Sequence, residues 1–210
     1  MDFTHPSALR PLRTPAALTE AGLWLMAVLY LLKALATPLA TNSVPPVVLA
    51  SFLWTGLAVL GWVYTIATFL VWLYQARENL DLRGEQRMRW AKGWTIGGWF
   101  IPFANLVIPA RVVGEVYARS EPGGGPVWRM PRLVLVWWLA FILGIVRFTY
   151  QSVGPDRVMH VYGAEFWNLV NGVAGAVAAV LAVRIVRRIT AWQAEPVEQP
   201  STTSDPRGWR

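Results

Sequence analysis

Long apolar runs separated by short polar breaks dominate the pattern of this chain. No charged residue lies between Lys33 and Arg77, and this stretch is longer than the roughly 20 apolar residues that one bilayer crossing needs. A polar, proline-bearing break at 41–46 divides the stretch into the end of one helix and a second whole helix. The pattern therefore predicts membrane helices at about 18–41 and 47–76.

Two further apolar runs, at 133–153 and 162–183, predict a third and a fourth crossing. A Gly-Pro-Asp sequence between them is typical of a turn. In the fourth run, Gly172, Gly175 and Ala179 give a small-residue face that favours close helix packing. We therefore expect an all-α, polytopic membrane protein with four transmembrane helices.

The uncharged segment 93–109 does not fit this pattern of whole crossings. It is shorter than a spanning helix, and Pro102 would interrupt the helical hydrogen bonds near its middle. If the segment crossed the membrane, the basic arginine clusters after it would lie on the outer side. If it returned to the cytoplasmic side, only Arg157 would lie in an outer loop. We therefore predict a re-entrant or interfacial, proline-broken element between helices two and three. Whether it spans, re-enters or lies on the membrane stays open.

A short amphipathic helix is expected directly after this element, at 111–119. Arg111, Glu115 and Arg119 recur there at four-residue spacing, which favours an Arg–Glu–Arg ladder along one face. Such a helix is typical of a membrane surface.

The polar ends of the chain flank a single transmembrane domain, expected at 18–190. The N-terminal segment 1–17 is predicted to be cytoplasmic, and the Pro-, Ser- and Thr-containing tail 193–210 to be cytoplasmic and disordered. A cleaved signal peptide is a rival interpretation of the first run, because Ala34-Leu35-Ala36 resembles a cleavage site. Lys33 just before it, and the helices that follow, favour an uncleaved anchor.

Composition and charge support a membrane protein and indicate its orientation. Of 210 residues, 55% are hydrophobic and only 15% charged, against about a quarter charged in soluble domains. The net charge of +7 comes from basic residues beside the apolar runs, which marks a cytoplasmic side holding both termini. The scarcity of lysine suits a GC-rich bacterial genome, so we expect a bacterial cytoplasmic membrane. No nucleic-acid-binding motif accompanies the charge, so nucleic acid is not an expected partner.

The expected partners are the lipid bilayer, anionic lipids and other membrane proteins. A basic linker follows the second helix and supplies the candidate contacts to anionic lipids. These contacts are Arg83, Arg87, Arg89 and Lys92.

Charged residues at membrane depth form the main candidate site, because such residues need a partner or a water-filled cavity. With helices one and three running outward, the outer half of the membrane would contain Lys33, Arg147, Glu165 and Asn168. An Arg147–Glu165 pair between adjacent antiparallel helices is the natural inference. Two interpretations remain open: a polar cavity that binds an ion, proton or headgroup, or a structural salt bridge with Lys33 reaching outward.

Other chemistry finds little support in the sequence. Cysteine is absent, and His5 and His160 have no metal-ligand spacing, so no metal or cofactor site is predicted. No Gly-rich phosphate loop and no Ser–His–Asp grouping can be assembled, so no catalytic residue is predicted.

The middle of the chain resembles the domain of unknown function 4328 proteins, found mainly in actinobacteria. The resemblance rests on residues 72–79, Gly93-Trp94 and 97–106, extended by Pro109 and Trp137-Trp138. It implies a multi-helix membrane protein whose activity is not established. It also draws attention to Arg77, Asn79, Trp99, Pro102, Asn105 and Pro109. Asn105 would either satisfy backbone groups freed by Pro102 or line a pocket facing the cytoplasm.

Three functions are compatible with these observations. The leading hypothesis is a non-enzymatic scaffold or regulatory partner of other membrane proteins. A small transporter or channel subunit is the first alternative, although we find no internal repeat of the kind that transporters contain. A lipid-handling enzyme is the second, although no nucleophile or base can be named for it.

Overall fold

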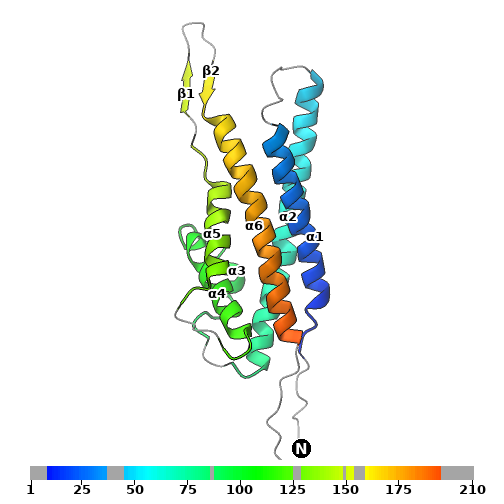
Figure 1. Cartoon of the computed structure of the whole chain (residues 1–210), viewed down its shortest axis with the longest axis vertical. Helices are drawn as coiled ribbons and strands as arrows, with labels where there is room; N and C mark the ends of the chain where they lie inside the picture. The colour runs from blue at the N-terminus through cyan, green and yellow to red at the C-terminus, as the bar shows by residue number, and fades with distance from the viewer. Residues whose placement is uncertain are drawn as a thin grey trace, which may run out of the picture.

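Six α-helices, one 3-10 turn and a β-hairpin make up the described part of the chain. The computed structural model describes residues 9–36, 45–85, 88–124, 129–148, 150–153 and 159–194. The elements in order are α1 (Arg13–Ala36), α2 (Pro45–Leu82), α3 (Trp94–Gly97), the 3-10 turn η2 (Ala104–Leu106), α4 (Ile108–Ser120), α5 (Arg132–Ile145), β1 (Tyr150–Val153), β2 (Met159–Tyr162) and α6 (Ala164–Ala194). They form an elongated bundle in which α1 and α5 run in one direction and α2 and α6 in the other (Figure 1).

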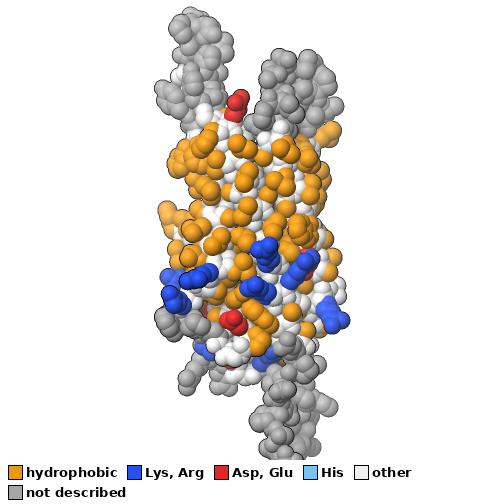
Figure 2. All heavy atoms as spheres, viewed as in Figure 1, with side chains coloured by type: hydrophobic (Ala, Val, Ile, Leu, Met, Phe, Trp, Pro, Cys, Tyr) orange, Lys and Arg blue, Asp and Glu red, His pale blue; other side chains and the backbone are white. Residues whose placement is uncertain are grey.

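Three of the described helices are long and apolar enough to cross a membrane, namely Arg13–Leu35, Phe52–Leu82 and Ala164–Ala194. Hydrophobic side chains cover the visible surface along most of the bundle (Figure 2). Lys and Arg side chains gather toward the end where α1 begins and α6 ends, which we name the basic end (Figure 2). A long apolar surface with cations at one end is typical of a membrane protein.

The first two helices agree with the sequence prediction in kind but differ in their ends. The first begins at Arg13 rather than at 18, and its predicted end at 37–41 lies outside the described residues. The second continues to Leu82, so that the start of the predicted polar linker is helical. Segments 1–8 and 195–210, which include most of the predicted tail, also lie outside the described residues.

The third predicted crossing, 133–153, is wrong over its second half. Helix α5 ends at Ile145, and its 14 residues span only about 21 Å at 1.5 Å per residue. Val146 is already extended, with ψ 133°, and β1 then pairs antiparallel with β2, so this part of the chain is not all-α. The reason is local: Val146, Thr149, Tyr150 and Val153 are β-branched or aromatic residues, which favour strands. The fourth helix correspondingly begins at Ala164 and is longer than predicted.

The predicted small-residue face of the last helix is confirmed, because it permits backbone contact with two neighbours. A Cβ added at Gly172 would lie 2.7 Å from the Cβ of Ala34 in α1, and one at Gly175 would lie 2.8 Å from the Tyr30 ring. On the other side, a Cβ added at Gly144 of α5 would lie 3.2 Å from the backbone of Gly175. Helix α6 is therefore held closely between α1 and α5.

Helix α4 is not the exposed surface helix that the sequence predicts. It packs against α2, α5 and α6, and all of its residues from Pro109 to Ala118 except Arg111 are buried. The reason is the row of Val112, Val113, Val116 and Tyr117, which reaches the core instead of a lipid surface. This helix therefore closes the bundle from the side near the basic end.

Candidate functional site

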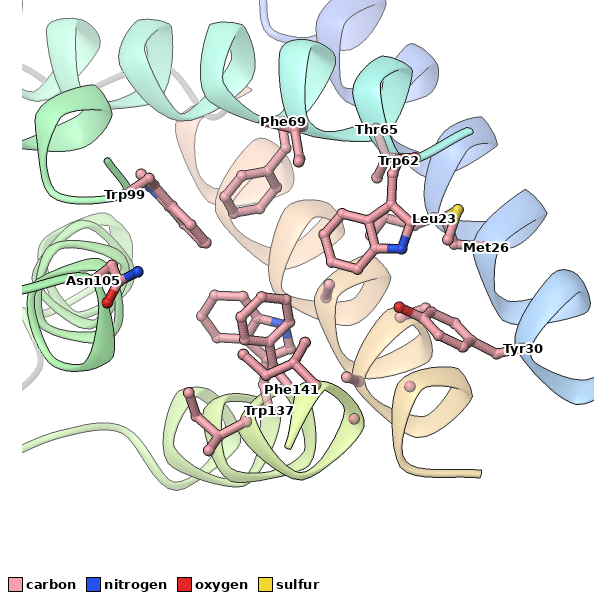
Figure 3. Close-up of a pocket in the computed structure, with 18 of the residues that line it drawn as sticks. Leu23, Met26, Tyr30, Trp62, Thr65, Phe69, Trp99, Asn105, Trp137 and Phe141 are labelled. Atoms are coloured by element: carbon pink, nitrogen blue, oxygen red, sulfur yellow. The ribbon is translucent and has the colours of Figure 1, made fainter. Parts of the chain in front are cut away.

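An apolar cavity of about 290 Å³ lies between α1, α2, α5, α6 and the 93–109 segment. Its wall is formed by Leu23, Met26, Tyr30, Trp62, Thr65, Ile66, Phe69, Leu70, Trp99, Phe100, Asn105, Leu106, Trp137, Phe141, Ile142, Gly144, Ile145, Gly175, Ala178, Ala179 and Ala182. The rings from α2 and α5 face one another across it, with Asn105 and Tyr30 at opposite sides (Figure 3). Because the lining comes from the middle of α1, α2 and α6, the cavity lies within the apolar length of the bundle.

Aromatic contacts make one wall of the cavity stiff. The ring of Trp99 is edge-on to Phe69 at 5.7 Å and to Trp138 at 5.9 Å between centroids. Trp138 in turn stacks on Phe141 at 5.1 Å. Such ring pairs add about 0.5–1.5 kcal/mol each beyond the burial of their surface. The wall therefore keeps its shape without a bound ligand.

Few polar groups reach this cavity. Tyr30 and Trp62 both line it, and the Thr65 hydroxyl donates to the Gly61 carbonyl oxygen at 2.7 Å. The indole nitrogen of Trp99 is buried and has no hydrogen-bond partner among the described residues. A largely apolar cavity with a small number of polar groups is typical of sites for small apolar ligands.

The 93–109 segment forms one side of the cavity and contains no long helix. It consists of α3, a series of turns and η2, and Pro109 then stands in the first turn of α4. The indole of Trp138 donates to the Leu106 carbonyl oxygen at 2.9 Å and holds η2 against α5. Phe103 has a φ of +63° and is 85% exposed, so its ring points away from the protein.

Two of the four residues of this segment that the resemblance emphasises, Pro102 and Asn105, lie at different places. Both are exposed, but only Asn105 lines the cavity. The Asn105 side chain makes no hydrogen bond to the described residues, so it does not satisfy backbone groups freed by Pro102. Of the two interpretations of Asn105, the structure therefore favours the pocket-lining one.

Arg77 and Asn79 are buried at the basic end, where they hold loops rather than face solvent. The Asn79 side chain accepts from the Arg10 amide at 2.7 Å and donates to the Arg10 carbonyl oxygen at 3.0 Å. Arg77 pairs with Asp81 one turn later and donates to the Trp90 carbonyl oxygen at 3.4 Å. These two residues therefore attach the N-terminal segment and the 88–92 loop to the end of α2.

Glu115 does not form the predicted ladder with the arginines of its own helix. It is 5% exposed, and its carboxylate accepts from the backbone amides of Arg89 at 2.6 Å and of Trp90 at 3.1 Å. Arg119 instead pairs with Glu85 at 3.0 Å. The ladder prediction is wrong because α4 is buried, and a buried carboxylate needs donors close to it.

Gln193 is a buried polar residue that the sequence analysis missed. Its amide donates to the Ala76 carbonyl oxygen at 3.0 Å and to the Ser120 hydroxyl at 2.8 Å, so it joins the ends of α6, α2 and α4. Trp72 donates to the Thr190 hydroxyl at 3.1 Å one turn away. A Gln following an apolar helix was the only sequence signal for this contact, and it resembles the start of a polar tail.

The predicted lipid-contact residues differ in how far they are available to a ligand. Lys92 lies 3.6 Å from Glu78 and 3.5 Å from Asp81, and Arg83 donates to the Gln193 carbonyl oxygen. Arg87 lies outside the described residues. Arg89 is exposed and lines a second hollow of about 320 Å³ together with Trp90, Val107, Arg111 and Glu115.

The predicted outer polar cluster is brought to one end of the bundle, but its expected ion pair is not formed. Lys33 lies in the last turn of α1 and Glu165 in the first turn of α6, both at the end opposite the basic end. In the described residues no ion pair joins Arg147 to Glu165, and both side chains are exposed. The reason is that α5 ends at Ile145, which leaves Arg147 on extended backbone rather than on a helix face.

Asn171 is a second polar residue that the sequence analysis missed. Its side chain donates to the carbonyl oxygens of Leu143 at 2.7 Å and Val146 at 2.8 Å. It thereby satisfies backbone acceptors at the end of α5, which a helix terminus leaves free. Asn168, one turn earlier, is half-buried. An Asn within an apolar helix is the sequence feature that indicates such a contact.

These features are those of a helical membrane protein. It has an apolar cavity in the side of its bundle, and the buried polar residues Arg77, Asn79, Glu115 and Gln193 form a polar network at its basic end. The chain belongs to the family described as domain of unknown function (DUF4328), whose profile matches residues 32–191. No curated protein and no solved structure matches the chain. The matched range includes most of the cavity lining and most of the network, whereas Leu23, Met26 and Tyr30 of the cavity precede it.

Proposed function

We propose that this protein is a non-enzymatic protein of the bacterial cytoplasmic membrane that holds a lipid chain in its lateral cavity and serves as a scaffold or regulatory partner. The observation that carries the proposal is the cavity of about 290 Å³ inside the apolar length of the bundle. An engineered apolar cavity of about half this size already binds benzene. The cavity opens toward the lipid side past Ile66 and Ile145, so a lipid chain from the surrounding bilayer could enter and fill it.

The chemistry of the lining supports binding rather than catalysis. Among the described lining residues there is no carboxylate, histidine or lysine. The polar groups that reach the cavity belong to tryptophan, tyrosine, threonine and asparagine side chains, which orient ligands more often than they transfer protons. A lipid-handling enzyme and a transporter are therefore the weaker alternatives.

The proposed topology has four crossings, with the basic end in the cytoplasm. Helix α5 begins at the basic end and α6 begins at the opposite end, so the chain passes along the bundle between them (Figure 1). Helix α5 and the extended residues after it would complete this passage. The 93–109 segment would lie in the cytoplasmic interface, which agrees with its short helices and exposed apolar side chains.

The test of the proposed function blocks the mouth of the cavity. Ile66 and Ile145 line it and are 40% and 49% exposed, so tryptophan at these positions would fill the opening from the lipid side. Leu60→Trp and Val63→Trp are matched controls, because both residues face outward on α2 and neither lines the cavity. The full-length chain is purified in detergent, and bound lipid is counted by native mass spectrometry.

We expect the Ile66→Trp/Ile145→Trp double variant to retain less than half of the lipid bound by the wild-type chain. The two controls should retain all of it. Equal retention in the double variant and the controls, with unchanged folding by thermal unfolding, would show that the cavity does not hold a lipid chain.

A further inference from the structure

Two arginines face the second hollow near the basic end and lack an acidic partner there. Arg89 and Arg111 are both exposed, and neither guanidinium group makes an ion pair or hydrogen bond within the described residues. The hollow of about 320 Å³ also includes Trp90 and Val107. Arginine is well suited to phosphate, because its planar group can donate two parallel hydrogen bonds.

The acidic residue in this hollow is held by the backbone of the 88–92 loop. Both carboxylate oxygens of Glu115 accept backbone hydrogen bonds, from the amides of Arg89 and Trp90. These bonds hold the 88–92 loop in place and so fix the position of Arg89 relative to Arg111. The start of α4 lies beside the same hollow, where the helix dipole adds partial positive charge.

The other cations of the basic linker that the structure describes differ in this respect. Lys92 is close to Glu78 and Asp81, and its ammonium group lies 5.7 Å from the centre of the Tyr74 ring. Arg83 contacts the backbone of Gln193. Of the described cations in this linker, Arg89 is therefore the one whose side chain remains available to an anion. Arg111, which belongs to α4 and not to the linker, joins it at the hollow.

The polar hollow and the apolar cavity are adjacent along the chain. Leu106 lines the cavity and Val107 lines the hollow, and both are about half exposed. A molecule with a charged head and an apolar chain would have to pass over these two residues to occupy both spaces. Trp90 adds an indole at the level of the hollow, a side chain that favours the headgroup region of a bilayer.

We infer that the two spaces together bind one anionic phospholipid, with its phosphate between Arg89 and Arg111 and an acyl chain in the cavity. This inference rests on the proposed function for its apolar half and adds the class of headgroup. A zwitterionic lipid with the same chains would bind more weakly, because its cationic group opposes the two guanidinium groups.

The test titrates the purified full-length chain with phosphatidylglycerol and with phosphatidylcholine carrying the same palmitoyl and oleoyl chains. Binding is followed by native mass spectrometry for wild type, Arg89→Gln and Arg111→Gln. The matched controls are Arg132→Gln and Arg184→Gln, which remove the same charge from exposed positions outside the hollow. Each hollow variant should weaken phosphatidylglycerol binding about fivefold, as expected for one basic residue near a headgroup. Phosphatidylcholine binding should stay the same, and the controls should change neither.

Two results would overturn the inference while leaving the proposed function in place. The first is an unchanged preference for phosphatidylglycerol in both hollow variants. The second is displacement of phosphatidylglycerol by glycerol 3-phosphate at equal concentration, which would indicate a site for soluble phosphates. Unchanged lipid binding in the Ile66→Trp/Ile145→Trp variant would instead overturn the proposed function, and the inference with it.

Discussion

Glu115 offers the most direct test of how the basic end is held together. The substitution Glu115→Ala removes a carboxylate that is 5% exposed and accepts two backbone hydrogen bonds, at 2.6 and 3.1 Å. Hydrogen bonds to charged groups contribute about 1.5–3 kcal/mol each. We take the lower value, because water can reach the freed amides of the partly buried 88–92 loop. The expected loss is therefore about 3 kcal/mol, or about 6–12 °C in Tm for a chain of this size.

The assay is thermal unfolding of the detergent-solubilised full-length chain, followed by the fluorescence of its 13 tryptophans. Glu115→Gln keeps one acceptor and should lose about half as much stability. Glu85→Ala is the control, since it removes a partly exposed ion pair with Arg119 that contributes at most about 1 kcal/mol. Equal shifts for Glu115→Ala and Glu85→Ala would refute the reasoning, because the buried carboxylate would then stabilise no more than a surface ion pair.

Two further predictions concern helix packing and orientation. Gly175→Ala should lower Tm by several degrees, because its Cβ would lie 2.8 Å from the Tyr30 ring, whereas Gly56→Ala should not lower it, because nothing lies within 4 Å of that position; equal effects on thermal unfolding would contradict the packing. Because the chain contains no cysteine, single cysteines report orientation directly. Glu165→Cys should react with a membrane-impermeant maleimide on intact cells and Asp81→Cys only after permeabilisation, and the reverse pattern would place the basic end outside.

The long helices were predictable because their signal is local and one-dimensional. The uncharged run before Arg77 and the small residues around Gly175 indicate a membrane span and a close contact without knowledge of any partner. The end of α5 was missed for a related reason. Residues 146–153 mix apolar residues with Arg147, Gln151 and Ser152, and hydropathy alone does not distinguish a helix from extended backbone there.

The cavity and the polar network could not be predicted, because each depends on residues far apart in sequence. Glu115 binds backbone amides some 25 residues away, and backbone donors carry no residue signature. The cavity is lined by five segments, so no single segment shows it. The resemblance drew attention to residues of both, since Trp99 and Asn105 line the cavity and Arg77 and Asn79 belong to the network. It did not indicate that these residues lie at two different places.

The strained backbone at Phe103 makes the conformation of the 93–109 segment depend on whether water or lipid surrounds the Phe103 ring. A non-glycine residue with a φ of +63° and ψ of −40° is held at a cost of about 1–3 kcal/mol. Transfer of the exposed phenylalanine ring from water into hydrocarbon contributes a similar amount, about 1.5–3 kcal/mol. The two quantities are of the same order, so contact of the ring with acyl chains in the proposed topology would offset the strain of the turn, whereas water would not. Because the same segment carries Trp99 and Leu106, the thickness and composition of the bilayer would act directly on the cavity wall.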